Sequence, residues 1–160
     1  MAEVFIALGG NQGDRRTLLS AALDRLSAIV AIERMSPIYE TAPKYVTDQP
    51  AFLNAAVSGR TGLDPEPLLD ALKGIERGLG RVAGVRFGPR PIDLDILFYD
   101  ALRIDTPRLT IPHPRLRERR FVLRPLADIA PDHLHPETGE TVVEMLEALP
   151  LEDDVRLFDG

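Results

Sequence analysis

The chain has 160 residues, of which 44% are apolar and 28% charged, and these proportions are typical of a globular protein rather than a disordered one. The length predicts a single domain over residues 1–160. The net charge of −6 argues against a general role in binding nucleic acid. The chain has no cysteine, which excludes disulfides and thiolate metal sites and is compatible with the cytoplasm.

The N-terminus has neither the basic segment nor the long apolar segment of a signal peptide. No apolar run approaches the roughly 20 residues that a membrane helix needs. We therefore expect a cytoplasmic protein without a membrane partner.

The first half of the chain predicts interleaved strands and helices. Residues 4–8 are apolar on both faces, as in a central strand. The Gly9-Gly10 segment that follows matches neither GxGxxG nor Walker A, so we interpret it as a tight turn with glycines at positive φ. Asp14 is a suitable N-cap for a helix with an apolar stripe, and a second strand is expected over residues 31–39.

The rest of the chain predicts further strands and helices, with a loop and a tail. A loop at 41–50 leads directly into a strand at 51–58, and Asp64-Pro65 opens a helix that ends near Gly78. A strand at 93–99, a short pairing strand within 100–110, helices at 121–129 and 142–149 and an acidic, mobile tail follow, with the capping box Thr141-x-x-Glu144 opening the last helix. Since only a loop joins the second and third strands, we expect an α+β fold with an antiparallel or mixed sheet.

The strand at 93–99 carries the first candidate site. Alternation places Ile92, Leu94, Ile96 and Phe98 on one face and Asp93, Asp95, Leu97 and Tyr99 on the other. The two carboxylates would lie roughly 6.5–7 Å apart along the strand, where they can hold one or two hard cations. Solvated carboxylates on an edge strand are the competing interpretation.

An arginine-rich loop precedes the two acids. Arg81, Arg86 and Arg90 stand among glycines, and guanidinium groups match phosphate oxygens. These arginines could be solvated, or they could belong to an arm, mobile without ligand, that closes over polyphosphate. The pairing of acids for metal with bases for phosphate favours the second interpretation.

Further candidates lie on both sides of this region. Phe52 and Asn54 share a strand face and could receive a flat heterocycle, although a core ring and a loop-bonding amide explain them equally. Arg108, Thr110 and His113 could contact phosphate, while His113 between two prolines could be structural. We interpret His133 and His135 as surface residues.

Several of these segments together resemble a known family. They are Leu8-Gly-Gly-Asn-Gln-Gly-Asp14, Tyr39-Glu-Thr41-x-Pro43, Asp48-Gln-Pro-x-Phe52-Leu-Asn54-Ala-Ala-Val57, Gly80-Arg81, Arg86-Phe-Gly-Pro-Arg90-x-x-Asp93-x-Asp95-Ile-Leu, Arg108-Leu-Thr110-Ile-Pro-His113 and Arg119-x-Phe121. In this order they resemble the signature of the 6-hydroxymethyl-7,8-dihydropterin pyrophosphokinases, enzymes of folate biosynthesis.

The resemblance implies a fold and a reaction. It implies a ferredoxin-like α+β fold, with helices on both faces of an antiparallel sheet, and a monomer. The implied enzyme is a Mg²⁺-dependent diphosphotransferase, in which the pterin hydroxymethyl oxygen attacks the β-phosphorus of ATP and AMP leaves. Two Mg²⁺ ions would be held by Asp93 and Asp95.

The resemblance also implies a role for each candidate. The catalytic residues would be Arg81, Arg90, Asp93 and Asp95. The pterin would lie between Phe52 and Phe121, with its polar edge at Asn54 and at Thr41, Ala42, Pro43 and Lys44. ATP would be bound by Arg81, Arg86, Arg90, the backbone of Ile96, Arg108, Thr110, His113 and Arg119.

The chain departs from the family pattern at Ala83, where another arginine is common, and at Phe87, Ala42 and Pro114. Ala83 leaves open how many arginines clamp the phosphates. Two other functions remain as alternatives: a Mg²⁺-dependent nucleotidyl or phosphoryl transferase with another acceptor, and a non-catalytic ferredoxin-like module that binds RNA or a regulatory ligand.

Overall fold

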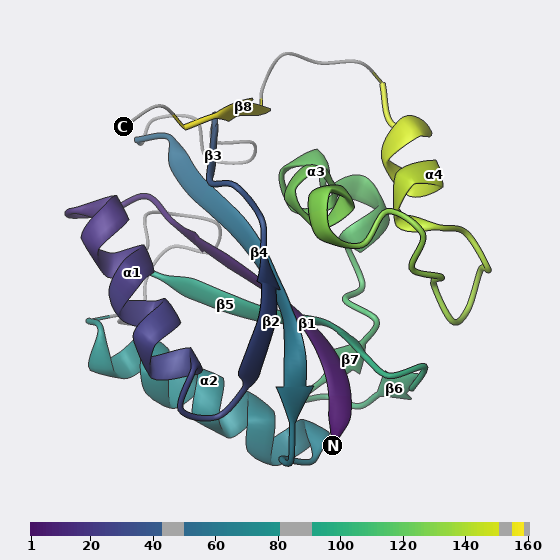
Figure 1. Ribbon diagram of the computed structural model, residues 1–160, viewed down its shortest axis with the longest axis horizontal. Helices are drawn as coiled ribbons and strands as arrows, with labels where there is room; N and C mark the ends of the chain where they lie inside the picture. The colour runs from purple at the N-terminus through teal and green to yellow at the C-terminus, as the bar shows by residue number, and fades with distance from the viewer. Residues whose placement is uncertain (43–49, 81–90, 151–154, 159–160) are drawn as a thin grey trace.

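The computed structural model describes residues 1–42, 50–80, 91–150 and 155–158. Its main sheet contains β1 (Ala2–Gly10), β2 (Ala31–Met35), β3 (Tyr39–Thr41), β4 (Phe52–Thr61), β5 (Asp93–Tyr99) and β8 (Val155–Leu157). The strand order is β5-β1-β4-β3-β8, with β2 also on β4, and the pairings among the described strands are antiparallel (Figure 1). The sheet predicted as antiparallel or mixed is therefore antiparallel in the described part of the chain.

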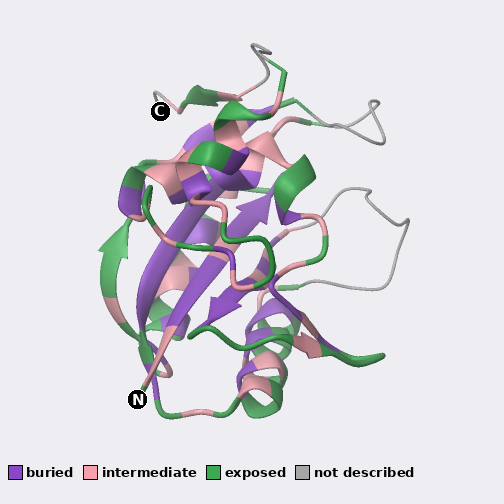
Figure 2. Ribbon diagram, turned by 90° about the vertical axis from the view of Figure 1, so that its right-hand side faces the viewer, coloured by how far each residue is buried: buried purple, intermediate pink, exposed green. Residues whose placement is uncertain are grey.

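Helices cover both faces of this sheet, as expected. The α1 helix (Arg15–Leu26) and α2 (Pro65–Gly78) lie on one face, and α3 (Arg120–Ile129) and α4 (Val142–Glu147) lie on the other (Figure 1). The side chains of β1 alternate between the two cores, because Ile6 and Leu8 face α1 and α2 whereas Phe5 faces α3. Buried residues accordingly follow the central strands between the two helical layers (Figure 2).

Shorter elements connect β5 to α3. They are β6 (Ile104–Asp105), β7 (Thr110–Ile111) and the 3₁₀ helix η1 (Leu116–Glu118). Two of the predicted helix caps form: Asp14 accepts the Thr17 N–H at 3.2 Å, and Thr141 and Glu144 form the reciprocal capping box. Asp64 stands at the N-cap position of α2 without a side-chain cap hydrogen bond. No helix among the described residues is long and apolar enough to cross a bilayer.

Two sequence predictions about strands were wrong. The strand expected over residues 31–39 is divided into β2 and β3, which both pair with β4. Three residues of the tail expected to be mobile form β8, which pairs with β3. Both differences depend on pairing partners that are distant in the sequence, and a local pattern does not reveal such partners.

A bulge in β5 overturns part of the predicted alternation. Phe5 pairs with Phe98 and Ile6 with Ile96, so Leu97 is an extra residue on β5. Phe98 therefore joins Leu97 on the α3 face, whereas Tyr99 packs on the α1 and α2 side. The predicted faces of Phe98 and Tyr99 are exchanged, while the strand before the bulge keeps its alternation.

Candidate active site

Asp93 and Asp95 lie before the bulge, on the sheet face that α3 partly covers. The register places Gly9 beside Asp93 and Ala7 beside Asp95, so β1 presents only small side chains to the two acids. Both aspartates are partly exposed. The small residues of β1 therefore leave space beside the carboxylates at this end of β5.

Gly9 has a role that the sequence interpretation missed. It belongs to β1 and pairs with Asn54 on one side and Asp93 on the other. A Cβ atom at Gly9 would lie 2.7 Å from Asn54 Oδ1, which is closer than side-chain contacts allow. The expected positive φ at Gly9 and Gly10 is wrong, since positive φ in this region occurs at Gly13. A close approach of the Asn54 amide, rather than a turn, requires glycine here.

The two carboxylates suit a hard cation such as Mg²⁺, which prefers oxygen ligands and keeps positions for water and phosphate. No cluster of three or more His, Asp or Glu side chains that could hold a metal exists among the described residues. The described part of the chain would thus supply two carboxylates, and the remaining ligands would come from the substrate and solvent. The oxygen donor set fits Mg²⁺ in this respect.

The bulge also positions His113. The carbonyl oxygen of Leu97 accepts the His113 backbone N–H at 3.1 Å, and His113 Nδ1 accepts the Arg115 N–H at 3.2 Å. The neutral ring therefore carries its proton on Nε2, which lies 4.0 Å from Asp95 Oδ2. Burial, and next the charge of Arg119, lower the pKa of His113 to about 4. At neutral pH the contact with Asp95 is consequently not an ion pair.

Of the residues predicted for the pterin, Thr41, Phe52 and Asn54 lie on the adjacent strands β3 and β4, and Phe121 lies on α3. The buried Asn54 donates its side-chain N–H to Thr41 Oγ1 at 2.8 Å, and Thr41 lies beside Phe52 in the β3–β4 pair. Phe121 stands in the first turn of α3, with the Arg119 guanidinium 5.5 Å from its ring centre. Phe52 and Phe121 are both half-buried, so each has ring surface left for a ligand.

Some of the predicted residues lie outside the described part of the chain, and two others are exposed. Pro43, Lys44, Arg81, Arg86 and Arg90 lie outside the described residues, as do Ala83, Phe87 and the expected mobile loop. Ala42 and Pro114 are exposed.

Three of the nucleotide candidates lie on β5 or in the segment that follows it. The Ile96 side chain is in the core, which leaves its backbone for a ligand. Thr110 opens β7. Arg108 is exposed and forms ion pairs with Glu66 at 3.1 Å and with Asp70, and the hydrogen bond to Asp70 is the main cause of its raised pKa.

Comparison with known proteins decides the family. The family model for 7,8-dihydro-6-hydroxymethylpterin-pyrophosphokinase (HPPK) matches residues 5–131. The chain belongs to the HPPK family. A curated relative, the Pseudomonas aeruginosa 2-amino-4-hydroxy-6-hydroxymethyldihydropteridine pyrophosphokinase, is 43% identical over 96% of both chains. The family expected from the sequence motifs is confirmed.

Several HPPK relatives are much longer proteins. The mitochondrial folate synthesis bifunctional protein of Arabidopsis thaliana is 56% identical over 79% of this chain, which corresponds to 23% of that protein. The present chain thus matches about a quarter of the length of such relatives. A crystal structure of HPPK-DHPS in complex with substrates superposes with a TM-score of 0.76 at 18% identity, covering 92% of this chain and 42% of that one. This likeness supports the ferredoxin-like α+β fold expected for the HPPK family.

Glu76 is a residue beside this candidate site that the sequence interpretation missed. It lies on α2, is 5% exposed, and accepts the Leu94 N–H through Oε2 at 2.7 Å. Leu94 stands between Asp93 and Asp95, so a buried carboxylate fixes the backbone that carries both acids. The available signal was the spacing, because Glu76 follows Leu72 by four residues and shares its buried face.

The two later histidines are not the surface residues expected from the sequence. The His133 ring packs on Phe5 and Phe98 with both ring centres at 4.5 Å, and His135 is buried. Burial lowers the pKa of both. Both rings lie against the aromatic residues at the end of the sheet away from the two aspartates.

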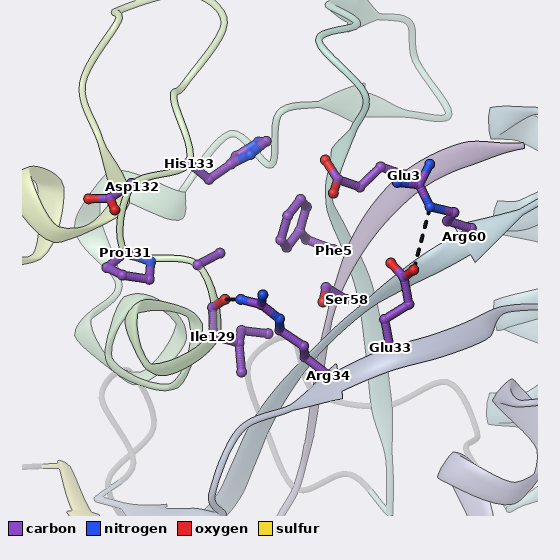
Figure 3. A pocket seen from close by; sticks show the side chains of 11 residues that line it. Glu3, Phe5, Glu33, Arg34, Ser58, Arg60, Ile129, Pro131, Asp132 and His133 are labelled. Atoms are coloured by element: carbon purple, nitrogen blue, oxygen red, sulfur yellow. Dashed lines mark hydrogen bonds and ion pairs between the residues drawn. The ribbon is translucent and has the colours of Figure 1, made fainter.

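A cavity of about 520 Å³ lies beside His133 (Figure 3). Its walls come from β1, β2, β4 and the segment after α3, and they include Glu3, Arg34, Ser58 and Arg60. None of the residues predicted for pterin, ATP or metal lines it. The cavity and the candidate active site therefore occupy opposite ends of the same sheet face.

Proposed function

We propose that this chain transfers pyrophosphate from ATP to the hydroxymethyl group of 6-hydroxymethyl-7,8-dihydropterin and releases AMP, as a step of folate biosynthesis. The observation that carries the proposal is the row Asn54–Gly9–Asp93 across three paired strands. In this row only Gly9 separates an amide suited to a heterocycle edge from a carboxylate suited to a metal. The family of the chain, HPPK, supports this interpretation.

Asp93 and Asp95 are the proposed holders of two Mg²⁺ ions. Bound metal would neutralise phosphate charge and align the attacking and leaving oxygens. The chain's own contribution at this point is rigidity: β5 is fixed by β1 on one side and by Glu76 at Leu94. Positioning and charge stabilisation dominate phosphoryl transfers, so a fixed pair of acids supports the reaction without a strong general base.

The remaining roles follow from chemistry and burial. Asn54, held by Thr41, would bind the polar edge of the pterin, and Phe52 and Phe121 would stack on its faces. His113 would donate a neutral Nε2–H to phosphate, since its lowered pKa keeps the ring uncharged at neutral pH.

The arginines would supply the positive charge. Arg108 would leave its ion pairs with Glu66 and Asp70 and bind phosphate instead. Arg119 would lie near the reacting groups. For Arg81, Arg86 and Arg90 the proposed role is a clamp on the triphosphate, with Arg81 and Arg90 catalytic.

Residues 1–160 are proposed to form one pyrophosphokinase domain, because both helical layers pack on a single sheet. The monomeric state and the cytoplasmic location stay predictions.

The test is product analysis. Purified protein is incubated with ATP, Mg²⁺ and 6-hydroxymethyl-7,8-dihydropterin, and the nucleotide products are separated. We expect AMP and the pterin pyrophosphate in equal amounts, with no turnover when Mg²⁺ is omitted. Release of ADP would contradict the proposal and favour a phosphoryl transferase. Turnover that Asp95→Ala leaves unchanged would contradict the metal assignment.

A further inference from the structure

The strand that holds Asn54 in place is short and is itself held from outside. β3 has three residues, and Thr41 on it accepts the Asn54 amide hydrogen bond. β4 pairs with one edge of β3 and β8 with the other, with Thr41 beside Val155 and Tyr39 beside Leu157 (Figure 1). Phe158, just after β8, donates its N–H to the Ile38 carbonyl at 2.8 Å. The C-terminal segment therefore supports β3, the strand whose Thr41 holds the Asn54 side chain.

Arg15, the first residue of α1, connects the same segments from the other direction. Its Nη1 atom donates to Glu40 Oε2 on β3 at 2.7 Å and to the Ala51 carbonyl at 2.9 Å. Its guanidinium also lies 5.6 Å from the centre of the Phe158 ring. One side chain thus contacts β3, the residue before Phe52, and the C-terminal segment.

A second side chain of the same segment strengthens this connection. Asn11, which is 1% exposed, donates its amide N–H to the Pro50 carbonyl at 2.9 Å. Asn11 and Arg15 together hold two consecutive carbonyls directly before Phe52. The chain entering β4 is consequently fixed at the point where the proposed pterin platform begins.

We propose that Arg15 and the β8 segment are positioning elements for the heterocycle half of the site. They keep β3 and the start of β4 in the arrangement in which Thr41 orients Asn54 and Phe52 stands beside them. This inference rests on the proposed function. It predicts a selective effect, because the two aspartates are on β5, which is separated from β3 by β1 and β4.

The experiment compares Arg15→Ala with Arg60→Ala. Arg60 is a matched control, since it also pairs with a glutamate, Glu33, but at the other end of β4. Dissociation constants are measured for 6-hydroxymethyl-7,8-dihydropterin in the presence of Mg²⁺ and a non-hydrolysable ATP analogue, and for the analogue alone. We expect Arg15→Ala to weaken pterin binding roughly tenfold and analogue binding less than about twofold, and Arg60→Ala to change neither.

Two further variants separate positioning from folding. Arg15→Lys keeps a cation for Glu40 and should recover part of the lost pterin affinity. Phe158→Ala should weaken pterin binding by a smaller factor, and its effect should be non-additive with Arg15→Ala, because both residues act through the same contact. Thermal unfolding of every variant is recorded so that binding is measured well below its midpoint.

The outcomes are distinguishable. Unchanged pterin binding in Arg15→Ala, with a wild-type protein that binds the pterin, would overturn the inference alone. Equal weakening of both ligands would indicate a general loss of structure and would also overturn it. A wild-type protein that binds no pterin would overturn the proposed function together with the inference.

Discussion

The two ends of β5 present opposite environments on the same face of the sheet. At its beginning, Asp93 and Asp95 lie beside Gly9 and Ala7 of β1, and both acids are partly exposed. At its end, Phe98 lies beside Phe5 and is 0% exposed beneath α3 and α4. The size of the β1 side chains decides the difference: small residues leave space for ligands, whereas an aromatic ring fills the layer and stabilises the fold.

The bulge at Leu97 separates the two ends. Because of the bulge, Phe98 packs in the core beneath α3. The Leu97 carbonyl accepts the His113 N–H, and the His113 imidazole lies near Asp95. One irregular residue therefore completes the core at one end of β5 and positions a side chain of the candidate site at the other. This division predicts that changes at the two ends affect different measurements.

The largest expected effect is on catalysis at the open end. Asp95→Asn keeps the shape of the side chain but removes the charge that would hold Mg²⁺. We expect kcat/KM to fall by about 10³-fold or more, about 4 kcal/mol of transition-state stabilisation. The free energy of unfolding should change by less than about 1 kcal/mol, since the carboxylate is partly exposed. Activity within tenfold of wild type would contradict the role of Asp95.

The complementary effect is on stability at the closed end. Phe98→Ala should lower the free energy of unfolding by about 3–5 kcal/mol, because it removes a fully buried ring and leaves a cavity. Urea denaturation measures this change, with Leu157→Ala as an exposed control expected within about 0.5 kcal/mol. A Phe98→Ala loss below about 1 kcal/mol would show that the two ends do not differ in packing.

Glu76 connects the two properties, since it is buried but serves the open end. Glu76→Ala would leave the Leu94 N–H without its acceptor, which should cost about 1–3 kcal/mol in the free energy of unfolding. It should also weaken the apparent affinity for Mg²⁺ during turnover. Glu76→Gln, which retains an oxygen acceptor, should lose less in both measurements. Equal losses for the two variants would contradict the hydrogen-bonding role.

The smallest expected effect concerns pH at the closed end. Burial lowers the pKa of His133, while nearby Glu3 opposes this shift and His135 adds to it. The unfolded chain therefore binds a proton more readily than the folded one, and stability falls as the pH drops from the usual imidazole pKa of about 6.5 toward the lower folded value. His133→Phe should flatten this decline in urea titrations. Burial also lowers the pKa of His113 and His135, so these residues contribute to the same decline. An unchanged slope would exclude a contribution from His133.

The sequence predicted the central parts of the site because they depend on spacing along one strand. Asp93 and Asp95 share a face, as alternation requires, and Phe52 and Asn54 are likewise two residues apart on β4. The capping box at Thr141 and the helix start at Asp14 were equally local and were confirmed.

Alternation failed after Leu97, where the pairing register with β1 changes. Nothing local to β5 marks that change, because the bulge is defined by which residues of β1 stand opposite.

By itself, the sequence determined the family, the α+β class and the pair of acids, since motifs, periodicity and caps act over a few residues. Only the tertiary structure showed that Gly9 leaves room for the Asn54 side chain, that Glu76 accepts the Leu94 N–H, and that the His133 ring packs on Phe5. It also showed that residues of the tail form β8, which pairs with the outer edge of β3. The physical reason is the same in each case: these roles arise from contacts between segments that meet only when the sheet forms.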